Sequence, residues 1–223
     1  MEEKLEYLKA QLMTMIDLVR SQVTLAHQAF LLLDKDYARE VLHYEARVNS
    51  LEMSIDRDCE YLLNRHRIQG GRLRFIISAL KINIQLERIG DHADMMGRIV
   101  LQRDTKFPDD LLQQVQLQEM FHLVIMILND ATQGYNFEDV EVARGVFAKE
   151  ARLREITARA TPILVAYAEQ HETDIALYLH LASYIQKMER IAELTKNITE
   201  ETIYYLGRTV DKHSTKPTLK KNV

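Results

Sequence analysis

The chain has 223 residues, enough for one large domain or for two bundles of roughly 100 residues each. Apolar residues make up 47% of it, while glycine (7) and proline (3) are scarce, which indicates a few long helices. A net charge of −4 without a basic stripe gives no indication of a nucleic-acid partner, and none is expected. The single cysteine, Cys59, excludes an intramolecular disulfide and a thiolate zinc site.

The N-terminal residues, Met1–Lys4, lack the basic start and apolar core of a signal peptide. The longest apolar runs, such as Leu123–Leu128, are far shorter than the ~20 residues that a membrane-spanning helix needs. We therefore expect a soluble, cytoplasmic protein.

Turn and capping signals divide the rest of the chain into six helical segments, most of them about 25–35 residues long. These signals are, in order, Asp34–Asp36, Gly70–Gly71, Asp104–Asp110, Gly134–Asn136 and Glu172–Asp174. Pro162 lies inside the fifth segment and is predicted to kink or interrupt it. The lysine-rich stretch 208–223 is predicted to be a disordered basic tail.

An internal repeat organises these segments. The second segment has a seven-residue rhythm of one helix face: Val41, Glu45, Val48, Glu52, Ile55, Cys59, Leu62. The same rhythm returns 105 residues later: Val146, Glu150, Leu153, Thr157, Ala160, Leu164, Tyr167. The third and sixth segments match at an offset of 102, where 86–91 pairs with 188–193. We predict an all-α fold of two tandem, sequence-related three-helix bundles, 1–104 and 105–207.

The third segment carries the most specific motif. Its stretch Ile76–Ala93, with Glu87 and Asp91, closely resembles the PhoU family of phosphate-uptake regulators, and Glu189–Ile198 resembles the same motif in that family's second repeat. The resemblance covers about residues 1–207. It implies a pair of three-helix bundles and a non-catalytic role that holds phosphate uptake and its regulon in check.

The resemblance also implies partners. In the family these are the ATPase or permease of a phosphate ABC transporter and the sensor histidine kinase of the phosphate response. It implies a homodimer that reaches the membrane only through such partners. An accessory of a different anion transporter with the same fold is the alternative.

In some members of the family the acidic motifs are associated with metal clusters. Carried over residue by residue, the resemblance points to one set of ligands in each repeat. These are Glu45, Asn49, Glu87 and Asp91 in the first repeat, and Glu150, Glu189, Glu193 and Asn197 in the second. The implied cofactor is a divalent or trivalent ion (iron, zinc, manganese or magnesium), and no organic cofactor is expected.

Helix geometry leaves the chemistry of these acids open. Glu87 and Asp91 stand four residues apart, so their carboxylates lie side by side and repel each other. A metal ion or a partner would compensate them, and so would arginines such as Arg88 or Arg98. In the sixth segment the acids fall opposite the main apolar stripe, which favours a partly solvated acidic face. Glu45 and Glu150 lie within an apolar rhythm, which favours a functional or buried-pair role.

Several positions depart from the family pattern and predict a divergent member. Met95 stands where the family usually has an asparagine, four residues after the motif aspartate. Arg154 occupies the position that matches Asn49. Ala192 replaces the usual glycine.

An enzyme of the di-iron carboxylate class is the alternative from a different class of protein. It would need two Glu-x-x-His pairs, and the chain contains Glu40/His43 and Glu119/His122. These pairs do not follow the repeat offset and fall in non-equivalent helices. No glycine-rich phosphate loop or nucleophile elbow is present in the sequence. We therefore predict that the protein is not an enzyme.

Overall fold

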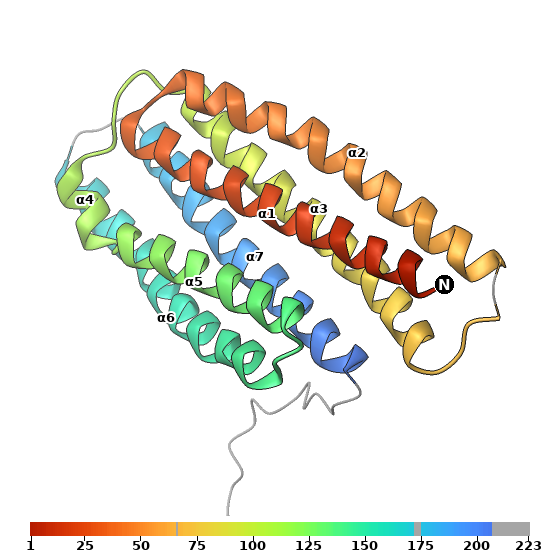
Figure 1. Ribbon diagram of the computed structural model, residues 1–223. Coiled ribbons are helices and arrows are strands. Elements are labelled where there is room, and N and C mark those ends of the chain that lie inside the picture. Colours follow the sequence, from red (N-terminus) through yellow and green to blue (C-terminus); the bar gives the residue numbers. More distant parts are fainter. Residues whose placement is uncertain (66, 172–174, 207–223) are drawn as a thin grey trace, which may run out of the picture.

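The computed structural model describes residues 1–65, 67–171 and 175–206. Within these ranges the chain forms seven helices (Figure 1). They are α1 (Glu2–Leu32), α2 (Lys35–Arg65), α3 (Gly71–Leu101), α4 (Asp109–Gln114), α5 (Leu117–Asn136), α6 (Val140–Gln170) and α7 (Ile175–Tyr205). The predicted all-α fold of two tandem bundles is confirmed, with α1, α2 and α3 in the first bundle and α5, α6 and α7 in the second.

Local signals set the ends of the first three helices. Leu33 adopts a left-handed conformation (φ 54°), and its N–H caps α1 by donating to the carbonyl of Ala29. Asp34 then starts α2, because its Oδ1 accepts hydrogen bonds from the backbone N–H groups of Asp36 and Tyr37 at 2.8 and 3.0 Å. Gly70, at φ 64°, precedes α3 in a conformation that favours glycine.

The second bundle differs from the prediction at one joint. The fourth predicted segment is two helices, because Gln116 adopts a left-handed conformation (φ 56°) that ends α4 and begins α5. The next break falls after Gly134, which stays inside α5 and lets α6 approach closely. A Cβ at Gly134 would lie 2.8 Å from the Cβ of Ala143. Asp139 caps α6, which continues through Pro162 without the predicted interruption.

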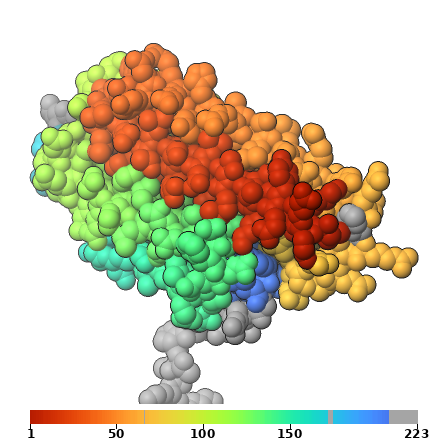
Figure 2. Space-filling view, in the orientation of Figure 1, coloured from red at the N-terminus to blue at the C-terminus, as the bar shows by residue number. Residues whose placement is uncertain are grey.

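The two bundles share one core. Helices α3 and α7 pack against each other in the middle, α2 and α6 lie on the outer sides, and α1 contacts α5 (Figure 1). The space-filling view shows the first bundle, red to yellow, resting on the second without a gap (Figure 2). The limits 1–104 and 105–207 remain predictions, because the buried apolar residues of both bundles form one cluster.

Two sequence-based predictions, the cap at Glu172–Asp174 and the tail at 208–223, lie outside the described residues. Among the described helices, none combines the length and the apolar character needed to cross a membrane.

Candidate functional site

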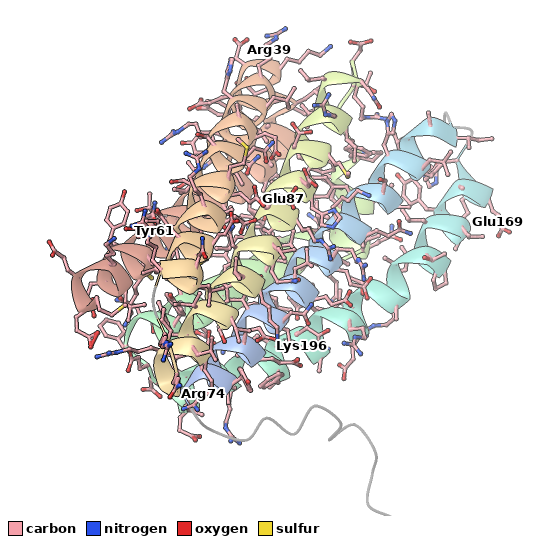
Figure 3. All side chains as sticks on the ribbon, turned by 90° about the vertical axis from the view of Figure 1, so that its right-hand side faces the viewer. Arg39, Tyr61, Arg74, Glu87, Glu169 and Lys196 are labelled. Carbon is pink, nitrogen blue, oxygen red and sulfur yellow. The ribbon has the colours of Figure 1, made fainter. Side chains whose placement is uncertain are left out.

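Both acidic motifs lie on one broad face of the molecule. Figure 3 shows α2, α3, α7 and α6 side by side on this face, with Glu87 on α3 and Lys196 on α7. Glu45 and Asn49 come from α2, and Glu87 and Asp91 from α3. Gly90 lets these two helices approach, because a Cβ at this position would lie 3.3 Å from Glu45 Oε2. The first repeat thus brings its predicted residues to one helix pair.

Glu45 is half-buried and incompletely bonded. Gln22 Nε2 donates a long hydrogen bond of 3.4 Å to Glu45 Oε2, whereas Oε1 is buried without a hydrogen-bond partner in the described part of the chain. Burial raises the pKa of Glu45, the hydrogen bond from Gln22 opposes the rise, and the charges of Asp91 and Asp94 add to it. The charge of this carboxylate is therefore poorly compensated. Gln22, which lies on α1, was not among the residues predicted from the sequence.

Glu87 and Asp91 are also poorly compensated. Burial raises the pKa of Glu87, the charges of Asp91 and Glu52 raise it further, and Arg88 opposes the rise. Within the described ranges no ion pair joins Glu87 or Asp91 to a basic residue. Arg98, a predicted candidate, instead pairs with Asp94, with 2.6 Å between Nε and Oδ2. The four-residue spacing of Asp94 and Arg98 is the sequence signal that could have revealed this pair.

The side chains of the first repeat have the chemistry of metal ligands, but they are not arranged as a metal site. Carboxylate and amide oxygens from Glu45, Asn49, Glu87 and Asp91 are hard ligands suited to Mg²⁺ or Mn²⁺. In the part of the chain that the structure describes, however, no three histidine, cysteine, aspartate or glutamate side chains converge to hold an ion. The first repeat therefore supplies an acidic surface, not a closed coordination cage.

The second repeat compensates its central acid with the chain's own cations. Glu150 is only 7% exposed. Its Oε1 forms an ion pair with Arg154 and a second ion pair with Lys196, whose Nζ lies 3.3 Å away. This is the buried pair that the apolar rhythm allowed. The rhythm could not reveal Lys196, because that residue comes from a different helix.

The other predicted residues of the second repeat are half-buried and dispersed. Glu193 pairs with Arg190, one turn away on α7. Asn197 Nδ2 donates a 3.4 Å hydrogen bond to Gln85 Oε1 on α3, so it joins the two bundles. Glu189 lines a small hollow of about 230 Å³ between α6 and α7. The structure thus bears out a partly solvated acidic face.

A larger groove of about 810 Å³ runs between α2 and α3, and we call it the acidic groove. Its lining residues are Glu52, Met53, Asp56, Arg57, Glu60, Leu63, Asn64 and Leu80. Buried Asn83 of α3 connects the two helices by donating hydrogen bonds of 2.9 Å to Asp56 Oδ1 and to the Glu52 carbonyl. The groove combines negative charge with apolar contact area.

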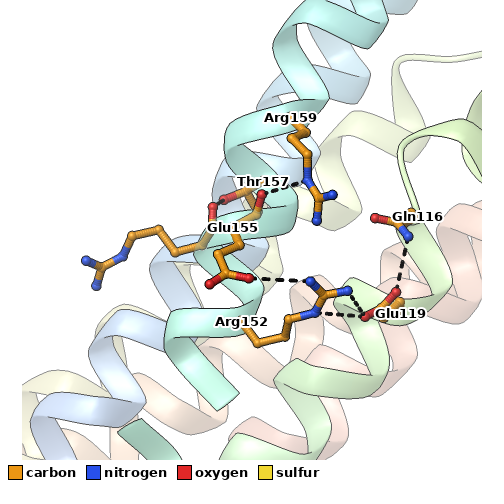
Figure 4. Close-up of polar contacts among 7 residues, drawn as sticks. Gln116, Glu119, Arg152, Glu155, Thr157 and Arg159 are labelled. Carbon is orange, nitrogen blue, oxygen red and sulfur yellow. Dashed lines mark hydrogen bonds and ion pairs between the residues drawn. The ribbon is translucent and has the colours of Figure 1, made fainter. Parts of the chain in front are cut away.

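The structure contradicts the di-iron arrangement, in which the ligands point into a bundle core. Glu40 and His43 are both exposed on α2. Glu119 faces α6 and accepts hydrogen bonds of 3.0 and 3.2 Å from Arg152 (Figure 4). Its partner in the motif, His122, is exposed. The two Glu-x-x-His pairs therefore do not meet.

The fold and the site together define a class of protein: a duplicated helical-bundle protein with an acidic motif in each repeat. The PhoU domain family model matches residues 12–100 and 117–202, one match in each repeat. The chain belongs to the PhoU family.

Relatives and solved structures agree with this assignment. The chain is 28% identical over 203 residues to the phosphate-specific transport system accessory protein PhoU of Edwardsiella tarda, covering 91% of this chain and 83% of the relative. The Escherichia coli K12 protein of the same name is 27% identical with the same coverage. The crystal structure of PhoU from Pseudomonas aeruginosa superposes with a TM-score of 0.84 at 27% identity, covering 92% of this chain and 98% of that chain.

Proposed function

We propose that the protein is a non-catalytic regulator that restrains phosphate uptake and the phosphate-starvation response. It acts in the cytoplasm as an adaptor between a phosphate ABC transporter and a sensor histidine kinase, and it assembles as a homodimer. The observation that carries this proposal is the PhoU domain match in both repeats. Relatives that align with most of the chain are named as accessory proteins of the phosphate-specific transport system, which supports the same role.

The acidic groove supports the adaptor role. It offers carboxylates from Glu52, Asp56 and Glu60 beside the exposed side chain of Met53, which is 58% exposed. Protein interfaces combine an apolar centre with a polar rim in this way. A partner segment with basic and apolar side chains would complement the groove in both respects.

A divalent cation at the first repeat is a further part of the proposal. The unpartnered buried oxygen of Glu45 and the adjacent charges of Glu87 and Asp91 supply the reason for a cation. Because the carboxylates do not converge, bound water would provide the remaining ligands, as is usual for Mg²⁺. Such an ion would shape the acidic surface and would not turn over substrate.

A deletion strain that carries a phosphate-starvation reporter tests the regulatory role. With abundant phosphate, we expect the reporter to switch on in the deletion strain and to fall silent when the intact gene is restored. A reporter that stays off would remove the regulatory claim and leave the family assignment standing. The departures at Met95, Arg154 and Ala192 would then favour an accessory role for another anion transporter.

Metal analysis of the purified protein tests the cation separately. The variant Glu87→Ala should lose metal that the unmodified protein retains after dialysis against Mn²⁺. The matched control is Glu40→Ala, which removes an exposed carboxylate on α2 that belongs to the di-iron motif. Equal metal content in the unmodified protein and Glu87→Ala would eliminate Glu87 as a ligand.

A further inference from the structure

The repeat allows the two acidic motifs to be compared position by position. At the offset of 105 residues Glu45 matches Glu150, and at the offset of 102 Glu87 matches Glu189. The burial of the two helix pairs follows the same correspondence. Val48 and Leu153 are both fully buried, as are Ile89 and Ile191. The two motifs therefore occupy equivalent places in equivalent bundles, and differences between them are differences of side chain.

Two of these differences change the charge of a side chain: one adds a positive charge, and the other replaces a negative charge with a positive one. Asn49 of the first repeat is replaced by Arg154, and Asp94 is replaced by Lys196. The first puts a cation in place of an amide, and the second puts a cation in place of a carboxylate that Arg98 neutralises in the first repeat. Both new cations pair with the same oxygen, Glu150 Oε1, one from α6 and one from α7.

Arg154 also serves the remaining acids of the motif. The pKa of its guanidinium is raised, first by the pairing with Glu150 and further by the charges of Glu189 and Glu193. Its side chain extends from a half-exposed position, whereas Lys196 is more buried. The two cations thus stand among the same carboxylates that the family resemblance assigned to a metal ion.

We propose that Arg154 and Lys196 are built-in counter-ions that fill the cation position of the second repeat, so that this repeat takes no metal and its acidic motif holds α6 to α7. A divalent ion that entered the motif would meet two positive charges and would have to displace both from a buried carboxylate. The guanidinium and the ammonium also satisfy Glu150 with hydrogen bonds. This inference concerns the second repeat alone and stands whether or not the first repeat binds an ion.

The test replaces both cations with the oxygen-bearing side chains of the first repeat. The double variant Arg154→Asn/Lys196→Asp places at these positions the residues found at Asn49 and Asp94. Purified full-length proteins are freed of metal with a chelator and titrated with Mn²⁺ by calorimetry, and thermal unfolding is followed with and without Mn²⁺. The control variant Arg144→Asn removes an arginine of α6 that is 53% exposed.

We expect the double variant to gain a Mn²⁺ site that a further Glu150→Gln substitution removes. Without metal its Tm should fall below that of the unmodified protein, and Mn²⁺ should restore the loss. The control should bind Mn²⁺ as the unmodified protein does. In the otherwise unmodified chain, Glu150→Gln should leave Mn²⁺ binding unchanged.

Two results would overturn the inference. A native Mn²⁺ site that disappears with Glu150→Gln would show that the second repeat binds metal despite its cations. A folded double variant without a new site would show that charge compensation is not what keeps metal out. If the double variant fails to fold without metal, the Glu150→Gln comparison in the unmodified background decides alone. Loss of metal in Glu87→Ala reports only on the first repeat, so the two proposals fail separately.

Discussion

The two repeats of this protein have the same three-helix arrangement and different hollows beside their acidic motifs. In the first, the groove between α2 and α3 measures about 810 Å³ and is lined by Glu52, Asp56 and Glu60. In the second, the equivalent hollow between α6 and α7 measures about 230 Å³, and Thr157 and Thr161 replace the first two acids. The two repeats therefore share their helix arrangement and differ in the side chains around the acidic motif.

We expect the strongest loss of stability when both cations that pair with Glu150 are removed from the second repeat. The variant Arg154→Met/Lys196→Met would leave Glu150 buried without a cation, and we expect it to lower the free energy of unfolding by roughly 3 kcal/mol. Urea unfolding followed by circular dichroism measures this change, and Arg144→Met serves as the control. A loss no greater than that of the control would mean that Glu150 finds solvent instead.

A second prediction concerns the joint between the repeats, where His27 of α1 stacks on Phe121 of α5 with 3.6 Å between ring centroids. Its Nδ1 lies 2.9 Å from the Tyr184 hydroxyl of α7. Burial lowers the pKa of His27 from 6.5 to about 4, and hydrogen bonding of the ring to Gln118 opposes this shift.

The unfolded chain therefore takes up this proton below pH 6.5, whereas the folded chain does so only near pH 4. The contribution of neutral His27 to the free energy of unfolding should be complete above pH 6.5 and should fall by up to about 3 kcal/mol as the pH approaches 4. Unfolding measured across this range checks the slope. His27→Gln should flatten it, and the exposed His43→Gln should leave it unchanged. An unchanged slope in His27→Gln would assign the acid sensitivity to other groups.

A third prediction exchanges the small residues at the two helix crossings. A Cβ at Gly90 would lie 3.2 Å from Gln22 Oε1 and 3.2 Å from Val48 Cγ1, so Gly90→Ala should destabilise the first repeat by about 1 kcal/mol, because this crowding outweighs the gain in helix propensity. Its counterpart Ala192 is 1% exposed, and Ala192→Gly should cost about 1 kcal/mol through helix propensity and lost contacts. Thermal unfolding of both variants provides the measurement. A stabilised Gly90→Ala would show that α2 can retreat from α3.

The smallest expected effect has the opposite sign to the largest. Glu45→Gln removes an incompletely compensated charge, so it should stabilise the protein at pH 7–8 by less than about 1 kcal/mol, because solvent screens part of the penalty. The folded-state pKa of Glu45 lies above 4.5, so the penalty is present above that pKa and disappears as the pH falls through it. Unfolding at neutral and acid pH should therefore show a gain that vanishes in acid. Destabilisation at neutral pH would mean that the ionised carboxylate is bonded after all.

Much of this organisation could be predicted from the sequence because it depends on periodicity. The rhythms that contain Glu45 and Glu150 repeat along single helices, and they placed both residues on packed faces. Contacts between different helices leave no periodic pattern in the sequence. The bonds from Gln22 to Glu45 and from Lys196 to Glu150 join residues 23 and 46 positions apart, and only the packed structure brings them together.

Backbone breaks were predictable only where residue type marks them. Gly70 and Asp34 stand at helix ends as their chemistry indicates, whereas the left-handed Gln116 carries no glycine or proline signal. Pro162 does not interrupt α6, because the helix continues past one missing backbone hydrogen bond. The acidic groove was likewise missed, because its Asp56 and Glu60 look like ordinary solvated positions in the sequence.

The central packing of α3 against α7 has a consequence for how the protein is made. Contacts between these helices, such as the ion pair of Lys81 with Glu201 at 3.2 Å, join positions 120 residues apart. The first bundle is complete in the nascent chain well before α7 is synthesised, and domains generally fold in the order in which they emerge. The apolar side of α3 that α7 covers therefore stays exposed to solvent until α7 has left the ribosome. Docking of the two bundles is thus a late step of biosynthesis, and chaperone protection would matter most during this interval.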